Sequence, residues 1–506
     1  MASINNKEDE SILRPLADFP ASLWENCFDN YTLDQKEYDL YAEEIEALKE
    51  EVRSMLIGGR KRETIEKLNL IDAVEQLGIS YHFENEIDAL LEEIFHQNDE
   101  DFEALLQNGL SAAALHFRLL RQHGFNISSG TFKRFLNENG EFKETLGEDI
   151  KGLLSLYEAA EVRTHEDNIL EEALSFAITH LNANLMPDDS SSTIAKQVNH
   201  ALKQSLHKGL PRVEARHYIS VYEEDENHNP LLLRVARLDY RLLQMLYRQE
   251  LAYLTSWVND LGIVEKVPYS RNRVVENYFS GNGVFFEPQY TFGRIVIAKT
   301  LTILTIIDDT YDAYGTIEEL TAFRDAVERW DIKEIDGLPE YMEPTYMALL
   351  NLSEWVEKEL TKRGRSYAFS KYKEECKQYV RASYNQSCWF FTRELPPFPV
   401  YKVSALITST YFLLQTISFL AMESGTIDVF DWQTKDPKIL VASAKIARFI
   451  NDVASHEMGS EGRAAKDSSN GLIWVSGGGR QWWVDLGFEQ GRRRAAAEDR
   501  WWFGVF

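Results

Sequence analysis

Apolar residues recur at spacings of three and four along most of this chain, and charged residues fill the positions between them. Because an α-helix turns once in 3.6 residues, this spacing puts the apolar side chains on one helical face. Signals for β-strands are nearly absent. The pattern therefore predicts an all-α protein. Its clearest helical segments are Tyr38 to Leu56, Leu70 to Leu91, Ala112 to Arg121, Leu231 to Leu251 and Ala348 to Leu360.

Two polar stretches interrupt the helical pattern. Pro187 to Ser192 is typical of a loop, and Glu223 to Pro230 is typical of a charged connector. A chain of 506 residues is longer than one hydrophobic core usually allows, so we expect two domains. We place the boundary near residue 225, which gives helical domains at residues 1–225 and 226–458.

The last 48 residues, 459–506, follow no helical period. They contain nine of the 27 glycines and five of the 11 tryptophans. Glycine loses much backbone entropy when it is fixed in a helix, and exposed indole rings are unfavourable in water. We expect this tail to be disordered or poorly packed, which leaves the second domain incomplete.

Charge and cysteine content limit the possible binding partners and the cellular compartment. The chain has 54 Lys and Arg against 81 Asp and Glu, a formal net charge of -27. This charge argues against binding to nucleic acid or to an anionic membrane surface, so a phosphate-bearing substrate needs a local basic patch. The three cysteines are too few and too scattered for a disulfide framework, and they lack zinc-site spacing, which favours a reducing compartment.

The N-terminal segment resembles neither a secretory signal nor a transit peptide. By eye, no stretch approaches the about 18 to 20 apolar residues that a membrane span needs. We therefore expect a cytoplasmic protein without a membrane partner.

The most informative motif is Ile306-Ile307-Asp308-Asp309-Thr310-Tyr311-Asp312, at the end of an apolar run. On a helix, Asp308 and Asp312 are four residues apart and lie on one face. Adjacent carboxylates repel each other and are costly to desolvate, so we expect a cation between them. Mg²⁺ fits best, because it takes oxygen ligands and is commonly held by one or two carboxylates plus substrate phosphates.

A second polar motif lies near the end of the patterned chain. Asn451 and Ser455 are again four residues apart and offer two oxygens on one helical face, with Arg448 three residues earlier. Asn451 and Asp308 are too far apart in sequence to share a helix. The two helices could face each other across a cavity.

Arginines precede the aspartate motif. Arg271 and Arg273 lie a few tens of residues before Asp308. Guanidinium groups are always charged, and their planar donors suit a diphosphate. This pair is the basic patch that the net charge requires.

In this order and spacing, the motifs resemble those of the plant terpene synthases, specifically the cytosolic sesquiterpene cyclases with a class I active site. Asp308 to Asp312 resembles the aspartate-rich metal motif, Asn451 to Ser455 the start of the second metal motif, and Arg271 to Arg273 the Arg-x-Arg pattern. Arg14-Pro15 followed by Trp24 resembles the N-terminal signature of the sesquiterpene branch. Further stretches that agree are residues 70–87, 116–128, 210–220, 285–290 and 313–320.

The resemblance implies two helical domains, an N-terminal relic α-barrel and a C-terminal class I terpenoid synthase bundle. It also implies three Mg²⁺ ions, with Mn²⁺ as an alternative. With the arginines, these ions draw the diphosphate off farnesyl diphosphate, and an apolar pocket then guides the carbocation to a cyclic C15 terpene. Geranyl diphosphate is a secondary candidate substrate. The expected oligomeric state is a monomer.

The resemblance also implies roles for individual residues. Catalysis is assigned to Arg271, Arg273, Asp308 and Asp309. Substrate binding is assigned to Arg271, Asp308, Asp312, Arg448 and Asn451. Metal binding is assigned to Asp308, Asp312, Asn451 and Ser455.

The sequence departs from the family in three places. Gly459 occupies the position of the glutamate that ends the second metal motif, and Glu457 and Glu461 fall on another helical face. Ser280 stands where the family usually carries a tryptophan lining the pocket. The tail after Glu457 matches nothing in the family. A reading-frame shift or a mis-spliced gene is our hypothesis for it.

Two alternatives to an active sesquiterpene cyclase follow. The chain is an impaired or inactive product of a disrupted terpene synthase gene, or it is a chain-elongating prenyl diphosphate synthase. The second alternative normally needs two aspartate-rich motifs in a shorter chain, and here Asn451 to Ser455 stands in place of the second one.

Overall fold

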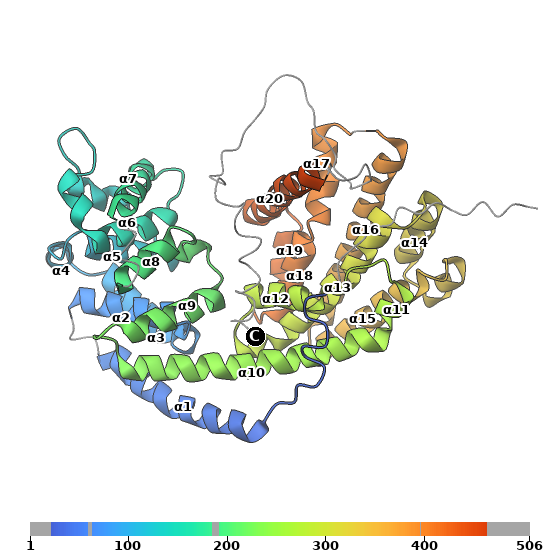
Figure 1. The fold of residues 1–506 in the computed structure, drawn as a ribbon, viewed down its shortest axis with the longest axis horizontal. Helices are drawn as coiled ribbons and strands as arrows, with labels where there is room; N and C mark the ends of the chain where they lie inside the picture. Colours follow the sequence, from blue (N-terminus) through green and yellow to red (C-terminus); the bar gives the residue numbers. More distant parts are fainter. Residues whose placement is uncertain (1–21, 59–62, 185–191, 395, 463–506) are drawn as a thin grey trace, which may run out of the picture. The chain divides into compact units, whose positions relative to one another are not determined.

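The computed structural model describes residues 22–58, 63–184, 192–394 and 396–462, and its helices are labelled in Figure 1. Within these residues the regular structure is helical, apart from one isolated bridge between Leu136 and Phe142. The predicted all-α class is confirmed. Two compact units are present. The N-terminal unit comprises residues 33–247, and the C-terminal unit comprises residues 22–32 and 248–462.

The N-terminal unit encloses two clusters of buried apolar side chains. Helix α5 packs against α2, α4 and α6, and α6 packs against α7 and α8. The helices of this unit are α1 (Gln35–Gly58), α2 (Thr64–Gln76), α3 (Glu84–Phe95), α4 (Asp99–Leu106), α5 (Leu110–Gln122), α6 (Ile150–Glu161), α7 (Asn168–Asn184), α8 (Thr193–Ala201), α9 (Pro211–Glu224) and the first part of α10 (Pro230–Leu261). Short 3-10 helices lie at Ser80–His82, Ser129–Phe135, Glu144–Glu148 and Leu206–Lys208.

The segment from Leu70 to Leu91 is two helices, α2 and α3, so its prediction as one helix was wrong. The chain turns at Gly78, whose φ of 72° lies in the left-handed region. A Cβ atom there would stand 2.7 Å from the Cβ of Ala215. Both the backbone conformation and the close approach of α9 therefore require glycine at this position.

The C-terminal unit has one large core that involves α13, α14, α15, α16, α18 and α19. Its helices are the rest of α10, α11 (Ile263–Lys266), α12 (Val274–Val284), α13 (Thr291–Ala313), α14 (Ile317–Arg329), α15 (Glu343–Lys362), α16 (Phe369–Thr392), α17 (Phe398–Thr408), α18 (Tyr411–Ala421), α19 (Ile427–Gln433) and α20 (Lys438–Gly462). Short 3-10 helices lie at Pro288–Tyr290, Ile332–Gly337 and Ser366–Ala368. Helix α13 contacts α12, α15, α16 and α18, so it is the central helix of this unit.

A buried ion pair fixes the start of α13. The Arg294 side chain is fully buried and donates to both carboxylate oxygens of Glu250 on α10, at 2.9 and 2.8 Å. It also donates to the backbone carbonyls of Phe285 and Glu287. Because the guanidinium donors satisfy acceptors on two segments, α10 and the connection after α12, they hold α13 in a defined position relative to α10 and α12.

Two helical stretches of the described chain are long and apolar enough to cross a membrane by length and composition, so the expectation that no stretch reaches this length was wrong. They are Pro288–Ala313 and Phe398–Ala421. The first is 72% buried, as expected for the central helix of a bundle, and the second is 39% buried. Its apolar character comes from two consecutive helices, α17 and α18, with Thr410 between them at a φ of 66°.

The boundary near residue 225 stays a prediction. The connector between α9 and α10 lies there, whereas the two compact units change within α10, between Tyr247 and Arg248. The predicted loop lies outside the described residues except for Ser192, which caps α8. The tail from residue 463 onward also lies outside them. Trp24 is buried and packs near Phe28.

Candidate active site

The acidic motif occupies the last turns of α13. Asp308 and Asp312 share one face of the helix, as predicted from their spacing, and we call them the acidic pair. Asp309 follows Asp308 directly, so its side chain lies about 100° further round the helix. It is buried, with 1% of its surface exposed. The buried apolar residues before the motif pack in the core and therefore fix where this helix end, with its carboxylates, is placed.

Asp309 holds the segment that carries the first arginine. Its carboxylate accepts hydrogen bonds from the Ser270 hydroxyl at 3.0 Å and from the backbone N–H of Arg271 at 2.8 Å. The Nε of Arg271 donates to its other oxygen at 2.8 Å. Both oxygens of Asp309 are thus engaged, so its geometry favours positioning Arg271 over binding a ligand.

Arg271 lies directly beside the acidic pair. Its guanidinium donates to Asp308 at 3.0 Å, while a second contact joins it to Asp309 at 2.6 Å. The structure therefore brings Arg271, Asp308 and Asp309 together. Arg273 instead pairs with Glu276 at 2.8 Å at the start of α12, so the structure does not bring it to the carboxylates.

In this structure the charged form of the acidic pair is disfavoured. Burial, reinforced by the neighbouring carboxylates, raises the pKa of Asp312 to about 8, while Arg271 and Arg448 act in the opposite direction. Burial likewise raises the pKa of Asp308. Solvent reaches Asp312, yet enough protein surrounds it to disfavour the charged form. A divalent cation between the two carboxylates would favour their charged form and would take their oxygens as ligands.

The second predicted motif lies on α20. Arg448 forms an ion pair with Asp452 one turn later, and the Tyr401 hydroxyl of α17 donates to Asp452 at 3.0 Å. The charge of Arg448 lowers the pKa of Asp312, so this arginine acts electrostatically on the end of α13. Asn451 is exposed on the same helix, and the Ser455 side chain lies outside the described part of the structure.

Sequence analysis missed four residues of this region: Ser270, Tyr379, Tyr401 and Asp452. Tyr379 of α16 contacts the acidic pair through its hydroxyl, which lies 3.3 Å from Asp308. It belongs to a buried stripe with Tyr372 and Cys376, which is typical of a helix packed in a core.

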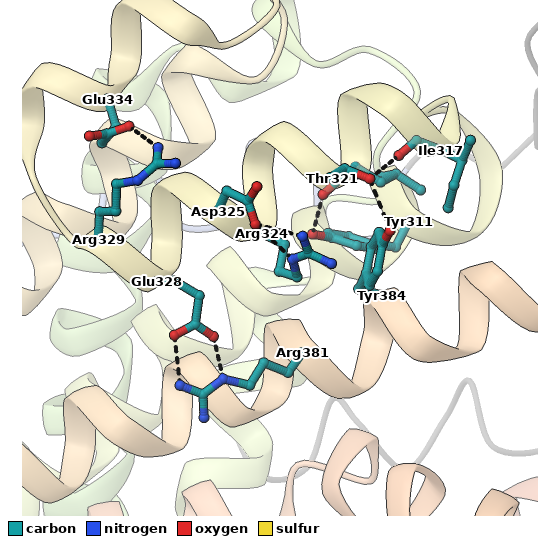
Figure 2. Close-up of polar contacts among 11 residues, drawn as sticks. Tyr311, Ile317, Thr321, Arg324, Asp325, Glu328, Arg329, Glu334, Arg381 and Tyr384 are labelled. Atoms are coloured by element: carbon teal, nitrogen blue, oxygen red, sulfur yellow. Dashed lines mark hydrogen bonds and ion pairs between the residues drawn. The ribbon is translucent and has the colours of Figure 1, made fainter.

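Polar contacts anchor α16 to α14 beside the site. Figure 2 shows Arg381 of α16 binding both carboxylate oxygens of Glu328 on α14. Thr321 and Tyr384 share a hydrogen bond of 3.0 Å, and the Arg324 guanidinium lies 4.2 Å from the Tyr384 ring centre. These contacts fix α16 against the segment that follows the acidic motif.

The donor chemistry fits a hard metal ion at the acidic pair. Within the described residues, no group of three or more His, Cys, Asp and Glu side chains forms a complete metal cage. Mg²⁺ does not need one, because it retains water molecules and binds substrate phosphates in addition to one or two carboxylates. Asp308 and Asp312 are such a pair, with Arg271 nearby to receive phosphate oxygens.

Family models match most of the chain. The terpene synthase N-terminal domain matches residues 23–202, and the metal binding domain of the terpene synthase family matches residues 259–469. The chain belongs to the terpene synthase family. Sequence comparison agrees, since this terpene synthase is 46% identical to germacrene A synthase of Pogostemon cablin over 456 residues, which cover 89% of this chain and 81% of the relative. It is 47% identical to (-)-5-epieremophilene synthase of Salvia miltiorrhiza over 450 residues, covering 89% and 82%.

Solved structures give the same result. Isoprene synthase from grey poplar, determined with three Mg²⁺ ions and dimethylallyl-S-thiolodiphosphate, has a TM-score of 0.79 at 33% identity and covers 93% of this chain and 88% of that one. Limonene synthase with 2-fluorolinalyl diphosphate has the same TM-score at 29% identity, covering 85% and 80%. The family predicted from the motifs, and its helical fold, are confirmed.

Proposed function

We propose that this chain is a Mg²⁺-dependent sesquiterpene synthase that ionises farnesyl diphosphate and cyclises the resulting carbocation to a C15 terpene. The observation that carries the proposal is the acidic pair at the end of α13 with Arg271 bound beside it. Two carboxylates one helical turn apart, one of them hydrogen-bonded to a guanidinium, are suited to holding a metal–diphosphate unit. The three Mg²⁺ ions bound to the poplar enzyme support Mg²⁺ for this site, with Mn²⁺ as an alternative.

The similar enzymes support a prenyl diphosphate of 15 carbons as the substrate. Germacrene A and 5-epieremophilene are C15 products, and both relatives share nearly half of their aligned residues with this chain. The poplar enzyme, which binds a C5 analogue, is more distant at 33% identity. A C15 diphosphate is therefore the favoured substrate, and geranyl diphosphate is a secondary one.

The chemistry divides between the ion and the residues of the chain. Bound Mg²⁺ supplies Lewis-acid stabilisation of the leaving diphosphate. Asp308 and Asp312 would hold the metal, and Asn451 with Ser455 would add two oxygens from α20. Arg271 and Arg448 would bind diphosphate oxygens and stabilise the charge that develops as the C–O bond breaks. Arg273 faces Glu276, so a role for it requires the Arg273 side chain to move.

One observation favours the alternative of an impaired enzyme. Helix α20 continues to Gly462, so residue 459 lies on the helix two turns after Asn451, and glycine provides no oxygen ligand there. The carboxylate that ends the second motif is therefore missing. The match to the metal binding domain ends at residue 469, within the tail. The hypothesis of a frameshift or mis-splicing predicts a transcript that differs across codons 450–470.

Product analysis tests the proposal. Purified full chain with Mg²⁺ and farnesyl diphosphate is expected to give cyclic C15 hydrocarbons by gas chromatography with mass spectrometry. Asp308→Asn should abolish them, whereas Asp336→Asn, which changes an exposed aspartate of the same unit, should not. No product from the unchanged chain, together with product from a Gly459→Glu chain carrying a family-like C-terminus, would establish the impaired enzyme instead.

Three further experiments test the remaining parts of the proposal. Longer prenyl diphosphates formed only with added isopentenyl diphosphate would establish a chain-elongating enzyme and overturn the proposal. Gel filtration with light scattering tests the proposed monomer. Fractionation of cells that express the chain tests the proposed cytoplasmic location.

A further inference from the structure

We propose that Tyr379 is a positioning residue for Asp308, and that its hydroxyl sets the orientation in which this carboxylate meets the metal–diphosphate unit. The inference rests on the proposed function, because it assigns a role within the same site. The Tyr379 hydroxyl donates to Oδ1 of Asp308 at 3.3 Å, and the Arg271 guanidinium donates to Oδ2 at 3.0 Å. Two donors from different segments thus hold the two oxygens of one carboxylate.

The two-sided contact restricts rotation of the carboxylate. With Arg271 alone, both oxygens could turn toward the guanidinium in the bidentate arrangement that arginine favours. The tyrosine hydroxyl competes for Oδ1 and keeps it on the side away from Arg271. Each oxygen keeps a further lone pair, which leaves room for a metal ion. The contact is longer than the usual 2.5–3.0 Å between hydroxyl and carboxylate oxygens, so it has room to shorten when the site is loaded.

Packing fixes the tyrosine ring. Only 3% of Tyr379 is exposed, and its ring belongs to the large core of the C-terminal unit. A buried hydroxyl needs a hydrogen-bond partner, and Asp308 is the acceptor that the structure gives it. Since the ring cannot swing into solvent, the hydroxyl is a fixed donor.

Helix α16 is itself held to its neighbours along the turns that follow this residue. The Arg381 and Glu328 pair lies two residues after Tyr379, and the contact of Tyr384 with Thr321 lies five residues after it (Figure 2). Ser387 donates to the carbonyl of Tyr311, the residue before Asp312. These contacts tie α16 to the acidic end of α13, so a small change at position 379 is transmitted to the carboxylate.

The chain offers a matched control on the same helix. Tyr372 is also fully buried on α16, and its hydroxyl pairs with that of Thr300 on α13 at 3.0 Å. Tyr372→Phe therefore removes one hydroxyl between the same two helices, but away from the carboxylates. A purely structural role of these hydroxyls predicts equal effects of the two substitutions.

Metal binding is the readout that separates the two roles. Mn²⁺ affinity in the presence of inorganic pyrophosphate can be measured by electron paramagnetic resonance, without turnover. Tyr379→Phe is expected to weaken it about 10-fold, the lower end of the loss seen when a partner of a metal ligand is removed. Tyr372→Phe is expected to leave it unchanged. Adding Tyr379→Phe to an Asp308→Asn chain should produce no further loss, because the carboxylate that it orients is gone.

The outcomes distinguish the inference from the proposed function. If the unchanged chain binds no Mn²⁺ with pyrophosphate, both are overturned. If it binds Mn²⁺ and Tyr379→Phe matches Tyr372→Phe, the inference alone is wrong. Circular dichroism of each variant checks folding. Should Tyr379→Phe fail to fold, Tyr379→His supplies a donor in a smaller ring, and affinity close to the unchanged chain would support the inference while a 10-fold loss would contradict it.

Discussion

Replacing Arg294 by methionine is expected to destabilise the C-terminal unit strongly. The substitution removes the guanidinium from a fully buried site and leaves the Glu250 carboxylate, among the described residues, with the hydroxyls of Tyr278 and Thr291 as donors. The carbonyl of Phe285 also loses its arginine donor. Breaking a buried ion pair by removing one partner costs about 3–5 kcal/mol.

The expected loss converts into a large thermal shift. For a unit of roughly 200 residues, 1 kcal/mol corresponds to about 2–4 °C in the melting temperature, so Arg294→Met should lower it by about 6–20 °C. Residues 33–247 contain no tryptophan, and Trp257, Trp330 and Trp355 lie in the C-terminal unit. Tryptophan fluorescence during heating therefore follows the relevant transition without a signal from the N-terminal unit.

Two further variants test whether the buried charge of Glu250 causes the loss of stability. Arg381→Met breaks a pair whose members, Arg381 and Glu328, are 42% and 32% exposed, and such pairs contribute about 0–1 kcal/mol. Arg294→Met combined with Glu250→Leu removes the buried charge as well and should recover much of the loss. If Arg294→Met melts no lower than Arg381→Met, or if the double variant melts below Arg294→Met, the buried pair does not hold α13 as described.

Two predictions concern the N-terminal unit, which far-UV circular dichroism follows. Gly78→Ala should destabilise it by about 2–5 kcal/mol, the sum of about 1–2 kcal/mol of left-handed strain and about 1–3 kcal/mol for the clash with Ala215. Gly140→Ala, with a φ of 85° but open space, should lose only the conformational part of about 1–2 kcal/mol, so equal losses would contradict the clash. Burial raises the pKa of the Glu158 carboxyl to about 8. Its protonated form therefore contributes stability to the folded unit below pH 4.5, and this contribution is lost as the pH rises to 8. Glu158→Gln should flatten this decline in the melting temperature with pH, and a variant that declines as steeply as the unchanged chain would refute the prediction.

The arrangement of the site residues that share one helix could be predicted from the sequence. The four-residue spacing of Asp308 and Asp312 fixes a common face on any α-helix, and the apolar run before them predicts a buried helix. Spacing alone does not say which carboxylate is free, because that depends on a segment 38 residues earlier. Asp309 is engaged by Arg271, and only the folded chain reveals this contact.

The other wrong or missed expectations have causes that are partly visible in the sequence. Gly78 interrupts an apolar period that otherwise runs on, and a single glycine did not outweigh the pattern. Arg273 has a glutamate three residues later, Glu276, which is a local partner that outcompetes the distant acidic pair. Tyr379 was hidden because its contact with Asp308 spans 71 residues and its helical face is otherwise typical of a core.

Release of pyrophosphate from farnesyl diphosphate tests whether the acidic pair supports cleavage of a prenyl diphosphate. We expect Mg²⁺-dependent release by the unchanged chain, with release at least about 100-fold slower for Asp312→Asn and unaltered for Asp336→Asn. Equal release by Asp312→Asn, or release that does not depend on Mg²⁺, would rule out this role of the acidic pair.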